Sequence, residues 1–332
     1  MSGPYFPDAR VLVTGGAGFI GSHVVDALVE RGQAVTVLDD FSSGRAENLK
    51  KAEPAIEIVE GDLCDGRVLE RALRSADVVL HLATRCVRLS LSDPAEVHRV
   101  NSEGTHRLLL EAVRRRVRRF VYVSSSEVYG TAVTVPMTEE HPLEPTTMYG
   151  ATKLAGELYT KAMTRSFGLP TVVVRPFNTY GPRAHFEGVY GEVIPRFTVR
   201  LLNGRPPVIF GDGLQTRDFT YVGDTVRGIL LAAAVATPTA HVFNIARGEE
   251  VTVLHLATLL TALVGGDRTP EHAEPRPADV RRHWADVQRA RTMLGFAADV
   301  EIEEGLRRYL AWFRETYPDP GACLGNDVVR NW

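Results

Sequence analysis

The stretch Val11-Leu12-Val13-Thr14-Gly15-Gly16-Ala17-Gly18-Phe19-Ile20-Gly21 decides the fold of this chain. Its apolar start predicts a buried strand, and its glycines recur at 15, 18 and 21 before a segment with helical periodicity, residues 22–31. This spacing allows a tight turn, close approach of the backbone to a pyrophosphate, and close packing of helix on strand. The amides at the start of a helix also favour phosphate. We therefore expect a dinucleotide site that includes Gly15, Gly18, Phe19, Ile20 and Gly21.

An acidic residue follows the second predicted strand, residues 34–38, at the position that usually complements such a glycine-rich turn. It is Asp39, eighteen residues beyond Gly21. A carboxylate at this position accepts hydrogen bonds from the ribose hydroxyls and repels a 2′-phosphate, so the sequence predicts NAD as the cofactor rather than NADP. Arg45 lies nearby but does not replace the acid, which leaves NADP as the minor alternative.

Residues after the third and fourth predicted strands, 56–59 and 78–82, fit the same pocket. Asp62 could reach the amino group of the adenine, and Leu63 could pack on its ring. The fourth strand ends in residues over which a cofactor would lie, namely Leu82, Ala83 and Thr84.

Strands and helical segments alternate along the first half of the chain, with further strands expected at 119–123 and 171–175. This alternation predicts an α/β fold, a Rossmann-type doubly wound parallel sheet with a smaller mixed α/β substrate-binding lobe. We expect residues 1–176 to form the NAD-binding domain, with a returning segment near 220–247. Residues 177–219 and 248–332 would form the nucleotide-sugar-binding lobe.

The composition is typical of a soluble globular protein, with 44% hydrophobic and 24% charged residues. A formal net charge of −3 gives no reason to expect nucleic acid or an anionic membrane as a partner. Three widely spaced cysteines argue against a disulfide framework or a metal site and fit a reducing cytoplasm. No secretory signal and no apolar stretch near eighteen residues is visible, so a cytoplasmic protein is expected.

Tyr149 and Lys153 are spaced by one helical turn in a chain that has four lysines against thirty-four arginines. An ammonium on the same helix face favours the phenolate, and this can bring a phenol, whose pKa is ordinarily about 10, toward use as a base. Read alone, this spacing occurs by chance on many helices.

The strand 121–123 ends in Ser124-Ser125-Ser126-Glu127-Val128-Tyr129-Gly130, and strand ends in such sheets are where ligands bind. With the Gly15–Gly21 turn and the Tyr149/Lys153 pair, this segment resembles the extended short-chain dehydrogenase/reductases that act on nucleotide sugars. The stretches 175–183 and 217–222 stand in the order of that family. The resemblance covers nearly the whole chain.

The resemblance implies roles for individual residues. Ser125 would hydrogen-bond the sugar oxygen that is oxidised, Tyr149 would be the base at the C4 hydroxyl, and Lys153 would bind the nicotinamide ribose and lower the pKa of Tyr149. The substrate would be bound by Ser126, Asn178, Phe210, Arg217, Arg276 and Asp279. Of these, Arg217 and Arg276 suit a diphosphate because a guanidinium donates two parallel hydrogen bonds.

The sequence leaves several reactions open for the step that follows formation of a 4-keto sugar. Dehydratases of this group carry an Asp-Glu pair after the catalytic hydroxyl, whereas this chain has Ser126 and Glu127, so dehydration is disfavoured. Glu127 also occurs in the matching segment of UDP-glucuronate decarboxylases, so it counts as a candidate catalytic residue or a structural one. Residues 87–91 resemble a segment of UDP-glucuronate 4-epimerases, where Arg85 and Arg88 could face a substrate carboxylate.

These features favour an NAD-dependent 4-epimerase of a UDP-hexose or UDP-hexuronate. A decarboxylase, and less so a 4,6-dehydratase, are the alternatives, and an NAD-sensing scaffold is disfavoured because both Tyr149 and Lys153 are present. The family also implies a homodimer formed by the helix after Asn101 and the helix that carries Tyr149. The segment 105–114 has more apolar residues than one core-facing stripe requires.

Overall fold

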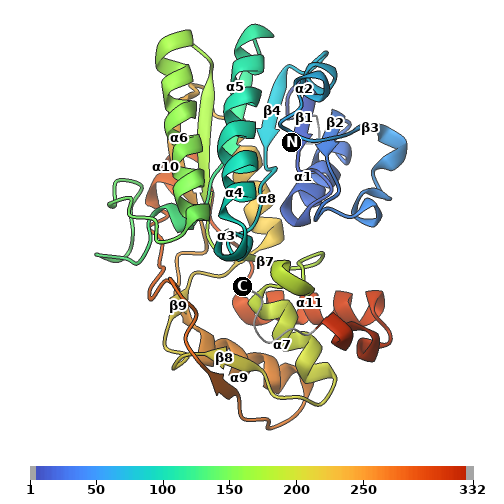
Figure 1. Cartoon of the computed structure of the whole chain (residues 1–332), viewed down its shortest axis with the longest axis vertical. Helices are drawn as coiled ribbons and strands as arrows, with labels where there is room; N and C mark the ends of the chain where they lie inside the picture. Colours follow the sequence, from blue (N-terminus) through green and yellow to red (C-terminus); the bar gives the residue numbers. More distant parts are fainter. Residues whose placement is uncertain (1–4, 327–332) are drawn as a thin grey trace.

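Parallel strands form the central sheet of the larger lobe, in the order β11-β6-β5-β4-β1-β2-β3 (Figure 1). They are β1 (Arg10–Thr14), β2 (Ala34–Asp39), β3 (Ile56–Glu60), β4 (Val78–His81), β5 (Arg119–Val123), β6 (Thr171–Pro176) and β11 (Thr239–Ile245). The computed structural model describes residues 5–326. The strand order reverses between β1 and β4, which creates the crevice where doubly wound folds bind ligands. The predicted Rossmann-type sheet is confirmed.

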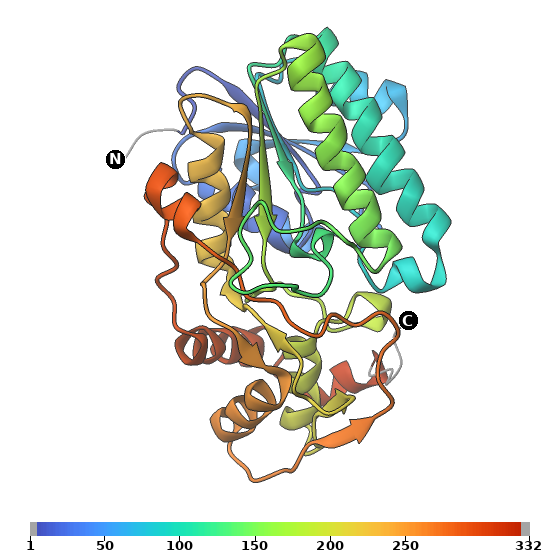
Figure 2. The same ribbon diagram turned by 90° about the vertical axis from the view of Figure 1, so that its left-hand side faces the viewer.

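Helices cover both faces of this sheet (Figure 2). One face carries α2 (Gly66–Ala72), α5 (Thr105–Arg114) and α6 (Met148–Phe167), and the other carries α1 (Phe19–Val29), α8 (Val222–Ala233) and α10 (Gln288–Leu294). Side chains alternate across a strand. In β1, Val11 and Val13 therefore pack with α1 and α8, while Leu12 packs in the cluster that includes Leu108 of α5. Burial on both faces explains why the strands read as continuous apolar runs.

The smaller lobe has its own core around α7 (Val193–Leu202), α9 (Val253–Val264) and α11 (Ile302–Thr316). Phe197, Leu256, Leu306 and Phe313 belong to this core. Short strand pairs complete the lobe and the seam between lobes: β7 (Thr179–Tyr180) with β10 (Thr220–Tyr221), β9 (Thr216–Arg217) with β12 (Val251–Thr252), and β8 (Val208–Phe210) with β13 (Glu271–Ala273). The β9–β12 pair is antiparallel and the other two are parallel.

The chain crosses between the lobes more often than the sequence indicated. After β6 it enters the smaller lobe, and β11 then returns to pair with β6 at the edge of the sheet. It enters the smaller lobe again, and α10 returns to pack on α8 and β11. The placement of 248–332 wholly in the smaller lobe was therefore wrong for α10, because Ala290 and Phe296 are buried in the core of the larger lobe. The remaining domain boundaries stay predictions.

Short elements surround the ends of the strands. They are α3 (Leu89–Ser92), α4 (Pro94–His98), the π-helix η3 (Arg99–Gly104), and the 3-10 turns η1 (Ala46–Leu49), η2 (Glu53–Ala55), η4 (Ser126–Val128), η5 (Gly188–Tyr190) and η6 (Pro320–Asn326). Within residues 5–326, no helix combines the length and apolar character needed to cross a bilayer.

Candidate active site

A cleft of about 450 Å³ opens at the carboxyl ends of the strands and is lined by residues of both lobes. It brings together every residue that the sequence suggested for the site: Gly15, Gly18, Phe19, Ile20, Gly21, Asp39, Asp62, Leu63, Leu82, Ala83, Thr84, Arg88, Ser125, Ser126, Glu127, Tyr149, Lys153, Asn178, Phe210, Arg217, Arg276 and Asp279. Their shared location follows from the topology, because carboxyl ends of parallel strands meet at one edge of a sheet. Their individual roles remain predictions.

The β1–α1 turn fits a dinucleotide phosphate. Gly15 has a φ of +69°, and a Cβ there would lie 2.7 Å from the backbone nitrogen of Ala83. Gly18 is the N-cap of α1, and the helix has neither a side-chain cap nor an acidic residue in its first turn. The first amides of α1 are therefore left to bind an anion in the cleft, as the sequence suggested.

Asp39 also stabilises the backbone of the glycine-rich turn, which the sequence did not indicate. Its Oδ2 accepts a hydrogen bond from the amide of Ala17 at 2.8 Å, and its Oδ1 accepts one from Phe41 at 2.9 Å. The carboxylate thus braces the phosphate-binding turn at the place where a ribose would lie. Burial raises the pKa of Asp39, and the two amide hydrogen bonds oppose that rise.

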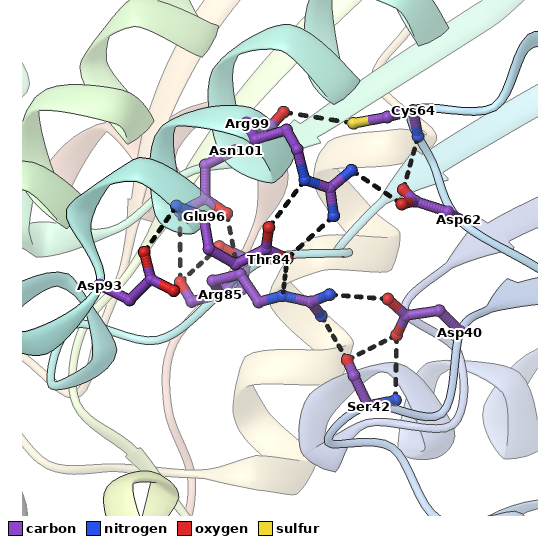
Figure 3. A network of polar contacts seen from close by, with 10 residues as sticks. All are labelled: Asp40, Ser42, Asp62, Cys64, Thr84, Arg85, Asp93, Glu96, Arg99 and Asn101. Atoms are coloured by element: carbon purple, nitrogen blue, oxygen red, sulfur yellow. Dashed lines mark hydrogen bonds and ion pairs between the residues drawn. The ribbon is translucent and has the colours of Figure 1, made fainter.

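A network of charged side chains links the segments around the dinucleotide-binding end of the cleft (Figure 3). Arg85 donates to Asp40 Oδ2 at 2.8 Å and to Glu96 Oε1 at 3.0 Å. Arg99 donates to the same Glu96 and to Asp62 Oδ2, the latter at 2.7 Å. Arg85 lines the cleft but is already paired with two acidic groups of the protein, and its contact with a substrate carboxylate stays a prediction. Asp62 lines the cleft while also paired with Arg99.

Tyr149 and Ser125 meet near the middle of the cleft. Ser125 follows β5, and its Oγ accepts the amide of Glu127 at 3.2 Å. Tyr149 lies in the first turn of α6, which Thr147 caps by accepting the amide of Gly150 at 3.1 Å. Both side chains line the cleft. Burial raises the pKa of Tyr149 well above its usual range, and hydrogen bonding from the Ser125 hydroxyl partly opposes this rise.

Lys153 is held by the strand rather than by the tyrosine. Its Nζ donates to the carbonyl oxygen of Val123 at 2.6 Å and lies 4.7 Å from the centre of the Tyr122 ring. Burial lowers the pKa of Lys153 to about 7. The expectation that Lys153 lowers the pKa of Tyr149 is not met by the protein alone, because burial dominates at both groups.

A buried ion pair beneath the cleft helps to fix the positions of Ser125 and Tyr149. Glu157 of α6 accepts from Arg175 of β6 at 2.8 and 2.6 Å, and both side chains are almost fully buried. Glu157 also accepts from Ser124, the residue before Ser125, at 2.6 Å. Helix α6 is thereby tied to the ends of β5 and β6, which sets the position of Tyr149 relative to Ser125.

The smaller lobe supplies the residues expected at the nucleotide. Arg217 forms an ion pair with Asp279 at 2.7 Å and donates to the carbonyl of Val280 at 2.6 Å. The guanidinium carbon of Arg276 lies 5.4 Å from the centre of the Phe210 ring. Asn178 Oδ1 is buried and, within residues 5–326, has no hydrogen-bond partner. A buried acceptor without a partner, in a residue that lines the cleft, is suited to a polar ligand.

Glu127 and Arg88 lie near Tyr149, and Glu192 lines the same cleft. Arg88 donates to the carbonyls of Val189 at 2.7 Å and Tyr190 at 2.6 Å, so it holds the η5 segment as well as lining the cleft. Burial raises the pKa of Glu127, and it raises the pKa of Glu192 to about 7. The sequence did not single out Glu192, because a lone acid before a helix gives no periodic signal.

Comparison with known proteins agrees with this geometry. Residues 11–246 match the model of the NAD dependent epimerase/dehydratase family. The UDP-glucose 4-epimerase of Mycolicibacterium smegmatis is 39% identical over 310 residues, which cover 92% of this chain and 98% of that protein. The structure of UDP-glucose 4-epimerase from Thermotoga maritima with UDP-glucose is 38% identical, with a TM-score of 0.88 and coverage of 92% of this chain and 99% of that one.

A dehydratase is similar to nearly the same degree. The structure of dTDP-glucose 4,6-dehydratase from Streptomyces venezuelae with NAD bound has 34% identity and a TM-score of 0.88, and covers 93% of this chain and 98% of that one. The predicted cofactor, NAD, is confirmed at the level of the family. The family match begins in β1 and ends just after β11, so it spans every strand of the main sheet. The chain is therefore a member of the NAD dependent epimerase/dehydratase family, as its resemblance to the extended short-chain dehydrogenase/reductases indicated.

Proposed function

We propose that this protein is an NAD-dependent 4-epimerase of a nucleotide sugar, of the UDP-hexose or UDP-hexuronate type. The observation that carries the proposal is that Ser125, Tyr149 and Lys153 line one cleft with the dinucleotide turn and with Arg217 and Arg276 of the smaller lobe. This shared cleft supports an acid–base role for Tyr149 between the proposed cofactor site and the proposed nucleotide site.

The chain's own groups account for the proton transfers and for binding. Gly15, Gly18 and Asp39 would hold NAD, which would supply reversible hydride transfer at C4 of the sugar. Tyr149 takes the proton of the C4 hydroxyl and later returns it to the ketone oxygen, while Ser125 hydrogen-bonds that oxygen. Arg217 and Arg276 bind the diphosphate, and Lys153 holds the nicotinamide ribose.

Ser126 supports epimerisation over dehydration. Elimination of water needs a group that protonates the departing hydroxyl, and the resemblance assigns that work to an aspartate at this position. A serine hydroxyl is a far weaker acid than a carboxylic acid. Glu127 alone gives one carboxylate beside Ser125, which leaves decarboxylation of a uronate as the alternative to be tested.

Mass spectrometry of the product tests the reaction directly. Purified protein is incubated separately with UDP-glucose and UDP-glucuronate, and also with dTDP-glucose because the base is open. We expect a product isomeric with its substrate, without accumulation of NADH. Loss of CO₂ from the uronate would show a decarboxylase instead, and loss of water would show a dehydratase.

We also propose a homodimer through α5 and α6, which lie side by side on one face of the larger lobe (Figure 2). Leu158 of α6 is 56% exposed and Phe167 is 61% exposed. Apolar side chains at this level of exposure, on a long helix, are suited to a helix-packed interface.

A further inference from the structure

Gln215 carries a buried hydrogen-bond acceptor that the protein itself does not use. The residue lies between β8 and β9, lines the cleft and is 8% exposed. Within residues 5–326, its Oε1 is buried and has no hydrogen-bond partner. The large majority of buried polar atoms in side chains are paired. An unpaired acceptor in a residue that lines the cleft therefore indicates a ligand that donates a hydrogen bond.

The orientation of this amide is fixed by the protein. The Nε2 of Gln215 donates to the carbonyl oxygen of Phe210 at 2.9 Å. If nitrogen and oxygen exchanged places, two acceptors would face each other, so this contact decides which way the amide lies. The backbone is held as well, because the amide of Val253 donates to the carbonyl oxygen of Gln215 at 3.1 Å. Oε1 is therefore a positioned acceptor.

The neighbours of Gln215 belong to the end of the cleft expected to hold the nucleotide. Gln215 and Arg217 both line the cleft, whereas Thr216 between them does not, which is the alternation of an extended strand. Phe210, whose carbonyl binds Gln215, offers an aromatic ring that lies 5.4 Å from the guanidinium carbon of Arg276. This end of the cleft thus combines arginines suited to phosphate, a ring suited to a base, and one acceptor without a donor.

We propose that Gln215 selects the base of the nucleotide sugar by accepting, at Oε1, the N3–H of uracil or thymine. The inference rests on the proposed function and names the base class that the function leaves open. Uracil and thymine both carry a hydrogen at N3, whereas cytosine has a lone pair there. A site built to accept a hydrogen bond rejects an analogue that lacks the donor, because the buried group of the protein is then left unpaired.

Free nucleoside diphosphates measure this selection without the sugar and without turnover. Calorimetry on the full chain with its bound NAD gives the Kd values of UDP, 5-methyl-UDP, CDP and 3-methyl-UDP. We expect UDP and 5-methyl-UDP to bind within about threefold of each other, because both keep the N3 hydrogen. CDP and 3-methyl-UDP should bind at least about tenfold more weakly than UDP, a difference of about 1.4 kcal/mol.

The Gln215→Met change keeps the length of the side chain and removes its hydrogen-bonding groups. It should shrink the preference for UDP over CDP at least about fivefold. A residue that only supported Phe210 would weaken both nucleotides alike and leave the ratio unchanged. Gln215→Leu gives a second test if methionine is poorly tolerated, with NAD content as the check of folding. Gln288→Met is the matched control, because Gln288 is an exposed glutamine of α10 and bonds Thr292.

Three outcomes would overturn the inference and leave the epimerase proposal standing. They are equal affinities for UDP and CDP in the wild-type protein, at least about tenfold weaker binding of 5-methyl-UDP than of UDP, and an unchanged ratio in both Gln215 variants. Failure of every nucleotide to bind the wild-type protein would instead overturn both proposals.

Discussion

The Nζ of Lys153 donates a hydrogen bond to the carbonyl oxygen of Val123 at 2.6 Å. The bond joins the first turns of α6 to the last residue of β5, two residues before Ser125. If residue 153 were an arginine, its larger, planar head group could not occupy this buried position in the same way. This provides a physical reason for a lysine here in a chain that otherwise uses arginine. Lys153 holds Tyr149 and Ser125 in register whether or not it also affects the pKa of Tyr149.

Replacement of Tyr149 by phenylalanine should abolish turnover while nucleotide-sugar binding stays within a few-fold. The change removes the acid–base group and typically costs about 10²–10⁴ in rate. Arg217 and Arg276 are left in place. Kinetics and calorimetry on the same preparation measure the two effects. Tyr159→Phe, on the same helix, is the control and should retain activity. Wild-type rates in Tyr149→Phe would mean that the catalytic assignment is wrong.

The protein should purify with bound NAD, because an epimerase regenerates its cofactor in each cycle and gains nothing by releasing it. Denaturation followed by an enzymatic assay of the supernatant identifies the nucleotide. Asp39→Ala should lower the NAD content and also destabilise the turn, since Asp39 accepts the amides of Ala17 and Phe41. Recovery of NADP from the wild-type protein would contradict the role given to Asp39.

Light scattering at micromolar concentration should give the mass of a dimer. Leu158→Arg should shift it to a monomer, because a charge would then be buried without a partner in an apolar interface. Leu214 is 54% exposed, nearly the same as Leu158 at 56%, but it lies in the smaller lobe between β8 and β9. Leu214→Arg should therefore remain dimeric. A monomeric wild type, or the same loss in both variants, would rule out the proposed interface.

Stability should fall in mild acid, in part through His81. This imidazole is fully buried between Thr14 Oγ1 at 2.7 Å and Thr105 Oγ1 at 2.8 Å, and burial lowers its pKa to about 3. Unfolded histidine titrates near pH 6.5, so between about pH 6.5 and 3 the unfolded chain binds the extra proton. The contribution is complete above pH 6.5 and is lost on acidification, by about 1.4 kcal/mol per pH unit.

Urea unfolding at pH 7, 6 and 5 checks this slope. His81→Asn should be less stable than wild type at pH 7, but its unfolding free energy should depend less on pH by about that amount per unit. His255→Asn, at an exposed position of α9, should keep the wild-type slope. Parallel pH profiles for His81→Asn and wild type would refute the assignment.

Local sequence patterns were sufficient to predict the parallel sheet and the shared location of Ser125 and Tyr149. The Gly15–Gly21 turn, the apolar runs and the serines after β5 each report on nearby backbone, and parallel topology then places strand ends together. Partners distant in sequence could not be found this way. Arg85 binds Asp40, which follows β2, and Glu96 of α4, so no local sequence pattern indicates that these two acids neutralise its charge.

The same limit applies to Glu192 and to α10. The sequence does not indicate that Glu192 is buried, that this burial raises its pKa, or that Arg88 from another segment lies near it. Helix α10 has only seven residues, of which Ala290 is buried, and only the fold shows that it packs on α8 and β11. Residues whose environment is set by tertiary packing are those that sequence patterns describe least well.

The return of β11 and α10 to the larger lobe bears on how such enzymes can be re-engineered. A chimera that took its smaller lobe from a relative would need junctions on both sides of the α8–β11 segment and again on both sides of α10. Each junction would have to preserve a buried seam. The lobes are therefore poor modules for recombination. Point changes at residues that line the cleft leave these buried seams intact.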